Sequence, residues 1–74
     1  MTVKVGQIYS YVDDYSQIEC KICVTFVLRF TAFGISSSGV TYDEGISFYE
    51  DLPLIAEYPT WQQAVNSPEF KGEK

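Results

Sequence analysis

Cys20 and Cys23 are the first residues whose type and spacing could do chemistry, because they form a Cys-x-x-Cys pair within the segment ECKICV. A redox or zinc-binding pair needs both sulfur atoms on one side of a turn or at the start of a helix. This segment instead alternates between apolar and polar residues, as a β-strand does, and strand side chains three residues apart point to opposite faces. Because the chain also has no histidine and no second cysteine pair, we expect no metal site and no redox site here.

Three pairs of neighbouring carboxylates are the next candidates, since a catalytic acid and base need two titratable groups close together. The pairs are Asp13-Asp14, Asp43-Glu44 and Glu50-Asp51. Each pair lies in a segment expected to be a turn or exposed surface, where adjacent side chains diverge into solvent. The segment GISSSG likewise lacks the lysine and the following helix of a phosphate-binding loop. The sequence therefore predicts a protein that is not an enzyme and that has no catalytic residues, cofactor or metal.

The combination of tyrosines and acidic residues favours protein binding instead. Tyrosine is a common anchor at protein interfaces, because its ring brings apolar area and its hydroxyl brings a polar tip. Tyrosines are also common in small β-cores, so for any single tyrosine a position in the core is favoured over one in an interface. The net charge of −5 disfavours direct nucleic-acid binding and suits a partner protein with a basic surface. The predicted partner-binding residues are Tyr9, Tyr11, Asp13, Asp14, Tyr42, Asp43, Glu44, Tyr49, Glu50 and Asp51.

Length and composition define the class of protein. The 74 residues, 46% of them hydrophobic, suffice for one small core and are too apolar for a disordered chain. We expect a single β-rich domain over residues 1–70 and a frayed tail at 71–74. No stretch approaches the roughly 20 apolar residues of a membrane span, and the N-terminus lacks the pattern of a signal peptide. A soluble, cytoplasmic protein without membrane contact is therefore expected.

The first predicted strand covers residues 3–12, which are rich in β-branched and aromatic types and end at a polar pair that favours a turn. Gly6 within this strand indicates a bulge or the close approach of another backbone. The face that carries Tyr9 and Tyr11 is open, because apolar residues occur on both parities. If Ile8 and Val12 point inward, the two tyrosines form a surface pair.

A second extended segment covers residues 15–33, where apolar and polar residues alternate almost without a break. We expect the even-numbered side chains from Ile18 to Phe30 to point inward, with Cys20 as an ordinary buried residue among them. The segment is far longer than a usual strand. It must therefore be one sharply bent strand or two strands that meet around Arg29.

The middle of the chain reads as short elements separated by turns. We expect a loop at 34–39, a strand at 40–42 and a turn at 43–45. The following segment ISFYEDL can form one helical turn, in which Ser47 and Glu50 have the spacing of a capping box.

The C-terminal segment carries the clearest local pattern. A last strand is expected at 54–58, and Thr60 then stands at the N-cap of a helix with Gln63 three residues later. Trp61 and Val65 lie one helical turn apart and should face the open end of the sheet. Phe70 is expected to hold the tail against the domain.

Two segments together resemble a known group of proteins: the opening KVGQIYSYVDD and the ending LPLIAEYPTWQQAVNSPEFK. They are similar to short, largely uncharacterised proteins of phages and prophages of low-GC Gram-positive bacteria, which end in a LIAEYPTWQxAVNS-like tail. The segment from Cys20 to Gly45 departs from this pattern. Together with the strand count, the resemblance implies a small SH3-like barrel, or a strongly bent antiparallel sheet of about five strands, with a short C-terminal helix.

The resemblance and the charge together suggest a function. We expect a non-catalytic, acidic protein-binding module of phage or prophage origin that inhibits a host defence or nucleic-acid enzyme by occupying a basic surface, in the manner of an anti-CRISPR protein. The alternative is a structural or assembly accessory protein of the phage that forms a homo-oligomer, held by strand edges or by the face of Tyr9 and Tyr11.

Overall fold

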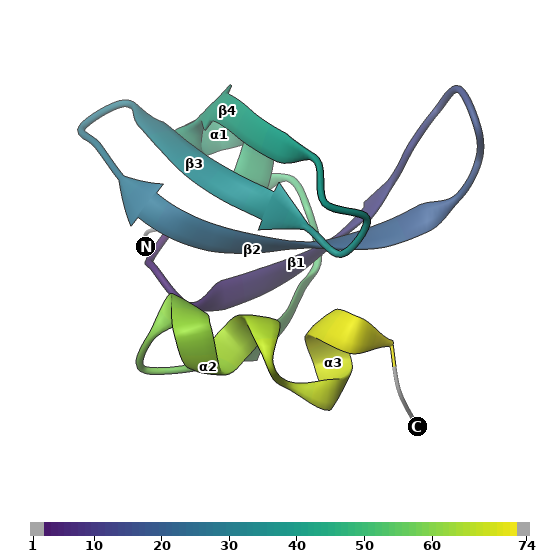
Figure 1. Ribbon diagram of the computed structural model, residues 1–74. Coiled ribbons are helices and arrows are strands. Elements are labelled where there is room, and N and C mark those ends of the chain that lie inside the picture. Colours follow the sequence, from purple (N-terminus) through teal and green to yellow (C-terminus); the bar gives the residue numbers. More distant parts are fainter. Residues whose placement is uncertain (1–2, 73–74) are drawn as a thin grey trace.

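The computed structural model describes residues 3–72, which form one five-stranded antiparallel sheet with helices on both faces (Figure 1). The elements are β1 (Gln7–Val12), β2 (Glu19–Val27), β3 (Thr31–Ser36), β4 (Thr41–Gly45), α1 (Ile46–Glu50), β5 (Leu54–Glu57), α2 (Trp61–Val65) and α3 (Pro68–Lys71). The strand order across the sheet is β4-β3-β2-β1-β5. The predicted mainly β domain with an antiparallel sheet of about five strands is confirmed. The SH3-like barrel is wrong, because β4 and β5 do not pair and the sheet stays open.

The long alternating segment at 15–33 divides into two strands. β2 and β3 are joined by a short turn at residues 28–30, so the prediction of two strands that meet around Arg29 is confirmed. The first residues of the segment are not a strand. The Asp13 carboxylate accepts hydrogen bonds from two backbone N–H groups that follow it, and these bonds turn the chain before β2 begins.

A β-bulge changes the inward face partway along β2. The bulge lies between Val24 and Phe26 and shifts the pairing with β3, which reverses the alternation of side chains beyond it. Val27 therefore packs into the same cluster as Val24, whereas Phe26 stacks on Phe33 with ring centroids 6.2 Å apart and is 56% exposed. The prediction that the even-numbered side chains from Ile18 to Phe30 point inward is thus wrong beyond the bulge and in the loops that flank β2. The exposed side chains among them are Ile18, Phe26, Leu28 and Phe30.

Both faces of the sheet are buried at its centre, each by different helices. On the α1 face the buried cluster consists of Val3, Tyr9, Ile22, Val24, Ala32 and Tyr49. On the α2 and α3 face it consists of Ile8, Cys23, Ala64 and Phe70. Consecutive residues of β1, Ile8 and Tyr9, are therefore both buried, on opposite faces. Tyr9 consequently does not form a surface pair with Tyr11, and the deeply buried cysteine is Cys23 rather than Cys20.

Two local predictions in the middle of the chain need correction. The predicted loop at 34–39 is shorter, because β3 continues to Ser36, and the predicted turn at 43–45 is the second half of β4. The helical turn in ISFYEDL is confirmed as α1. Its N-cap is Gly45 without a side-chain hydrogen bond, and Ser47 lies inside the helix because α1 follows β4 directly.

The predicted C-terminal elements are confirmed, with a different placement of the helix. β5 forms, and the Thr60 hydroxyl oxygen accepts a hydrogen bond from the Gln63 N–H at 3.2 Å as the N-cap of α2. α2 lies across a face of the sheet rather than at its open end (Figure 1), since its residue Ala64 is fully buried against Ile8 and Cys23. Phe70 is buried as expected. Lys71 ends α3 and Gly72 is its C-cap, while residues 73–74 of the predicted frayed tail lie outside the described residues.

Gly6 makes the close backbone approach that its position predicted. Its N–H donates a hydrogen bond to the Val24 carbonyl at 2.9 Å, and its own carbonyl accepts one from the Tyr58 N–H at 3.0 Å. These two bonds connect the chain before β1 to β2 and to the end of β5. Within residues 3–72, no helix combines the length and apolar character that crossing a membrane requires.

Candidate functional site

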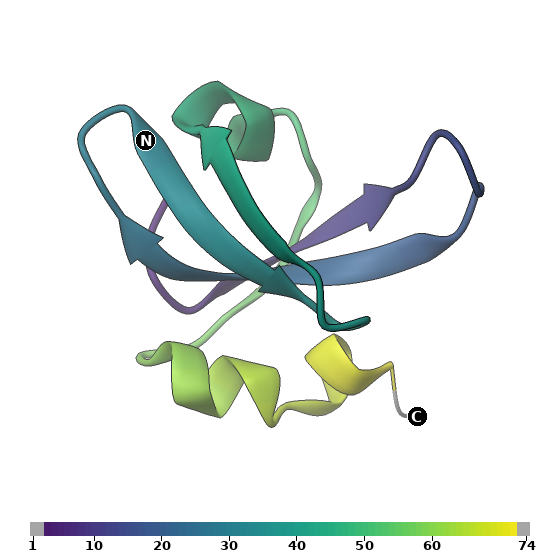
Figure 2. The ribbon, with the colours of Figure 1, turned by 45° about the horizontal axis from the view of Figure 1, so that its top comes forward.

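A groove occupies the part of the α1 face that α1 leaves uncovered. The β1–β2 hairpin extends beyond the rest of the sheet (Figure 2), and the β3–β4 turn lies across the groove from it. The space between them has a volume of about 480 Å³. We call it the hairpin groove; its lining residues are Tyr11, Asp13, Ser16, Ile18, Glu19, Cys20, Ser37, Ser38, Val40 and Tyr42.

Strand register places two tyrosines at the centre of the hairpin groove. Tyr11 lies opposite Cys20 in the β1–β2 pairing, and Tyr42 comes from β4. Their rings meet edge to face with centroids 5.9 Å apart, and Phe48 of α1 packs against Tyr11 at 5.6 Å. Because both rings pack against neighbouring aromatic side chains, these contacts fix their orientation in the groove.

Uncompensated negative charge surrounds these tyrosines. Burial raises the pKa of Tyr11, and the carboxylates Asp13, Asp14 and Glu44 raise it further. Hydrogen bonds from the Ser16 hydroxyl and from backbone N–H groups lower the pKa of Asp13, which keeps its carboxylate ionised. Within residues 3–72 the one ion pair joins Lys21 to Glu19 at 3.6 Å, so none of the three carboxylates around Tyr11 has a cationic partner there.

The structure gathers part of the predicted partner-binding set and separates the rest. Tyr11, Asp13 and Tyr42 line the hairpin groove, and Asp14 and Glu44 lie close enough to affect Tyr11. Tyr9 and Tyr49 are buried in the core, where a partner cannot reach them directly. Asp43 lies on the outer part of β4 opposite Phe33, and Glu50 and Asp51 are exposed at the end of α1.

Sequence reasoning did not identify several residues of the hairpin groove. Ile18, Cys20 and Val40 supply apolar surface, and Ser37 and Ser38 supply hydroxyl groups. No local pattern marks these residues, because they come from two hairpins that only the strand order brings together. The result is a groove with aromatic walls, carboxylates at its rim and apolar patches, which suits an apolar stem that ends in a cation.

Comparisons of this chain with protein families, curated proteins and solved structures gave no match.

The two thiols are poorly suited to nucleophilic chemistry. Burial raises the pKa of Cys20, and burial raises the pKa of Cys23 to about 11, so both stay protonated near neutral pH. They lie on opposite faces of β2, as the alternation predicted. Among residues 3–72 no three histidine, cysteine or acidic side chains are grouped to hold a metal ion.

Raising the pH from 8 to 11 under reducing conditions is expected to destabilise the protein through Cys23. In the unfolded chain this thiol ionises from its ordinary pKa of 9.0, but in the folded chain only near 11, so the unfolded state loses its proton first. Cys23 therefore makes its full contribution to the free energy of unfolding below pH 9, and on the order of 2 kcal/mol of this free energy is lost between pH 9 and 11. Urea unfolding at several pH values measures it. Tyrosines also ionise in this pH range, and a Cys23→Ala variant shows their contribution alone. If the free energy of unfolding of this variant falls with pH as steeply as that of the wild type, the prediction is wrong.

Proposed function

We propose that this chain is a non-catalytic protein-binding module that holds a basic surface of a partner protein against the hairpin groove. The observation that carries the proposal is the pair Tyr11 and Tyr42, packed edge to face and surrounded by carboxylates without a cationic partner in residues 3–72. Burying acidic groups against an acidic or neutral partner would cost free energy, whereas lysine and arginine side chains compensate them.

The resemblance to phage and prophage proteins supports a more specific role. On that basis the partner is a host defence or nucleic-acid enzyme in the host cytoplasm, and the chain inhibits it by covering its basic surface, as an anti-CRISPR protein does. Such an enzyme binds phosphate through lysine and arginine, and an acidic groove competes for the same side chains. Tyrosines then provide the apolar contact that phosphate lacks.

Removing two carboxylate charges near Tyr11 is expected to weaken partner binding about fivefold or more, mainly by slowing association. The test variant is the double substitution Asp14→Asn and Glu44→Gln. The matched control, Glu57→Gln with Glu69→Gln, removes the same charge elsewhere. Immobilised wild-type and variant proteins are incubated with lysate of a low-GC Gram-positive bacterium, and each retained protein is then purified for kinetic measurement.

Salt separates this proposal from adventitious capture. Raising the ionic strength from about 0.1 M to 1 M shortens the Debye length from about 10 Å to 3 Å, and should release a partner held by charge. Equal affinity of the two double variants for the retained protein, or retention that salt leaves unchanged, would show that the groove is not the binding site.

A second candidate, homo-oligomeric assembly, is supported by the apolar surface on the α2 face. Phe26 and Trp61 are 56% and 37% exposed, and both lie beside Phe33. Exposed apolar side chains that adjoin one another often mark interfaces. If this surface holds copies of the chain together, light scattering will show a mass that exceeds that of one chain and rises with protein concentration. The variant Phe26→Ser should then be a monomer. A monomer at all concentrations excludes this candidate.

A further inference from the structure

The outer edge of β4 has backbone groups available for another strand. β4 is the last strand on its side of the sheet. Antiparallel pairing uses alternate residues, and the hydrogen bond from the Ile46 N–H to the Phe30 carbonyl at 3.0 Å shows that the even-numbered residues bond to β3. Thr41 and Asp43 therefore direct their N–H and C=O groups away from the sheet. Both residues are exposed.

A groove lies beside this edge on each face of the sheet. On the α2 face, the Trp61 groove has a volume of about 380 Å³ and is lined by Thr25, Phe33, Gly34, Ile35, Thr41, Tyr42 and Trp61. On the α1 face, Val40 and Tyr42 form one wall of the hairpin groove. Side chains of a strand added beside β4 would point alternately to the two faces. An open edge with a side-chain site on each face is the arrangement that recognises an extended peptide.

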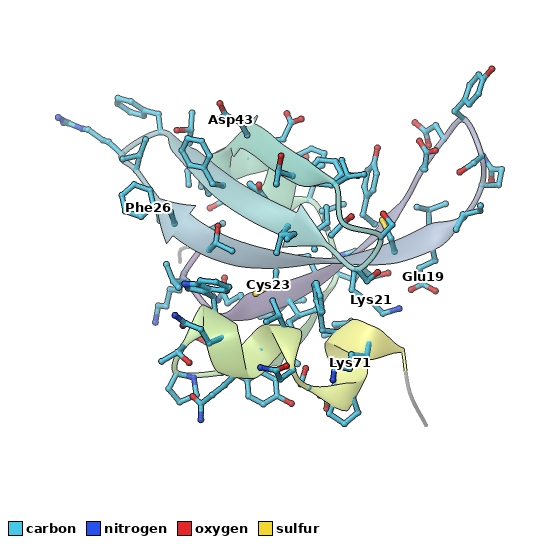
Figure 3. The ribbon with its side chains drawn as sticks, viewed as in Figure 1. Glu19, Lys21, Cys23, Phe26, Asp43 and Lys71 are labelled. Carbon is cyan, nitrogen blue, oxygen red and sulfur yellow. The ribbon has the colours of Figure 1, made fainter. Side chains whose placement is uncertain are left out.

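The charges on β4 select among the strands that could bind there. Figure 3 shows Asp43 and Lys71 on opposite sides of the molecule, and Asp43 has no ion pair within residues 3–72. Two copies paired symmetrically about Asp43 would place their carboxylates directly opposite each other, which destabilises a strand pair. Each copy also carries a net charge of −5. The edge therefore disfavours a second copy and favours a segment with lysine or arginine.

We propose that the outer edge of β4 binds an extended segment of the partner protein as a sixth strand, one in which lysine or arginine alternates with apolar residues. The backbone of the segment bonds to Thr41 and Asp43. Its apolar side chains enter the Trp61 groove, and its cations lie near Glu44 and the hairpin groove. This inference rests on the proposed function and specifies that the basic partner binds through an extended segment.

NMR titration of the isotope-labelled protein tests the inference with defined probes. The main probe is a short synthetic peptide of alternating valine and lysine or arginine. The first control peptide has glutamate at each basic position, and the second has proline at its centre, which removes a backbone donor. The basic peptide should shift the amide signals of Thr41 and Asp43 and slow their hydrogen exchange. The acidic peptide should bind at least about fivefold more weakly, and the proline peptide about threefold or more.

Two variants separate the backbone contribution from the charge. Thr41→Pro removes an outward N–H without changing charge, and proline is tolerated on an edge strand where the N–H faces solvent. Glu44→Gln removes a charge on the face where the cations of the segment lie and keeps the backbone. Each should weaken basic-peptide binding about two- to fivefold, whereas Glu57→Gln should leave it unchanged. If Thr41→Pro does not fold, the proline peptide still tests the backbone bonds on the wild-type protein.

Three results would overturn the inference. Shifts confined to Tyr11 and Cys20, with none at β4, would mean that the partner uses the hairpin groove alone, which leaves the proposed function standing. Shifts at β4 that depend on protein concentration without peptide would identify a second copy as the occupant. Equal affinities for the basic and acidic peptides would show that the edge of β4 does not select its peptide by charge.

Discussion

Gly6→Ala is expected to lower the free energy of unfolding by about 3 kcal/mol or more. A Cβ atom at this position would lie 2.2 Å from the Tyr58 carbonyl oxygen, and the φ angle of +94° is one that L side chains rarely adopt. The backbone cannot simply move away, because Gly6 bonds to Val24 and Tyr58 on either side. The variant therefore separates β5 from the start of β1 or distorts both.

Gly39→Ala is the matched control for this effect. Gly39 has nearly the same φ angle, +93°, but nothing lies within 4 Å of its Cβ position. Its substitution should cost only the conformational strain, about 1 kcal/mol. Urea unfolding followed by the fluorescence of Trp61 measures both variants. If Gly6→Ala and Gly39→Ala lower the free energy of unfolding equally, the backbone of Tyr58 does not limit the space at residue 6.

Tyr49→Ala is expected to lower the free energy of unfolding by about 3–5 kcal/mol. The Tyr49 side chain is fully buried at the centre of the α1 face, where it packs against Tyr9 and Phe48. Its hydroxyl donates a hydrogen bond to the Ala32 carbonyl at 3.0 Å. Alanine would leave a cavity between α1 and the sheet, and α1 would lose its only fully buried anchor.

Tyr49→Phe separates the ring from the hydroxyl. It keeps the packing and removes one hydrogen bond, so the expected loss is about 1 kcal/mol. Because Tyr49 is buried, this variant should bind the partner as the wild type does once both are folded. Lost binding in a stable Tyr49→Phe protein would place Tyr49 in the interface after all.

The features predicted correctly from sequence are those that a few neighbouring residues define. Thr60 caps α2 because its side-chain oxygen accepts a hydrogen bond from the Gln63 N–H, three residues later. This contact does not depend on the rest of the fold. Gly6 marked a close approach because glycine is favoured where another backbone comes near. The five strands followed from runs of β-branched and aromatic residues, and the split near Arg29 followed from the length limit of a strand.

The orientation of side chains could not be predicted in the same way. A single bulge in β2 moves Phe26 to the other face, and nothing in the local sequence marks its position. Tyr9 is buried because helices cover both faces of β1, which depends on how distant segments pack. An amphipathic pattern assumes one solvent face, and this sheet has none at its centre.

The amino-acid sequence alone determined that this chain is a small, acidic, mainly β domain with a capped C-terminal helix, because those properties depend on composition and on contacts between near neighbours. Only the tertiary structure decided which tyrosines are buried, that Glu44 lies near Tyr11, and that β4 is an edge. These depend on strand order and register, which bring together residues that are far apart in the chain.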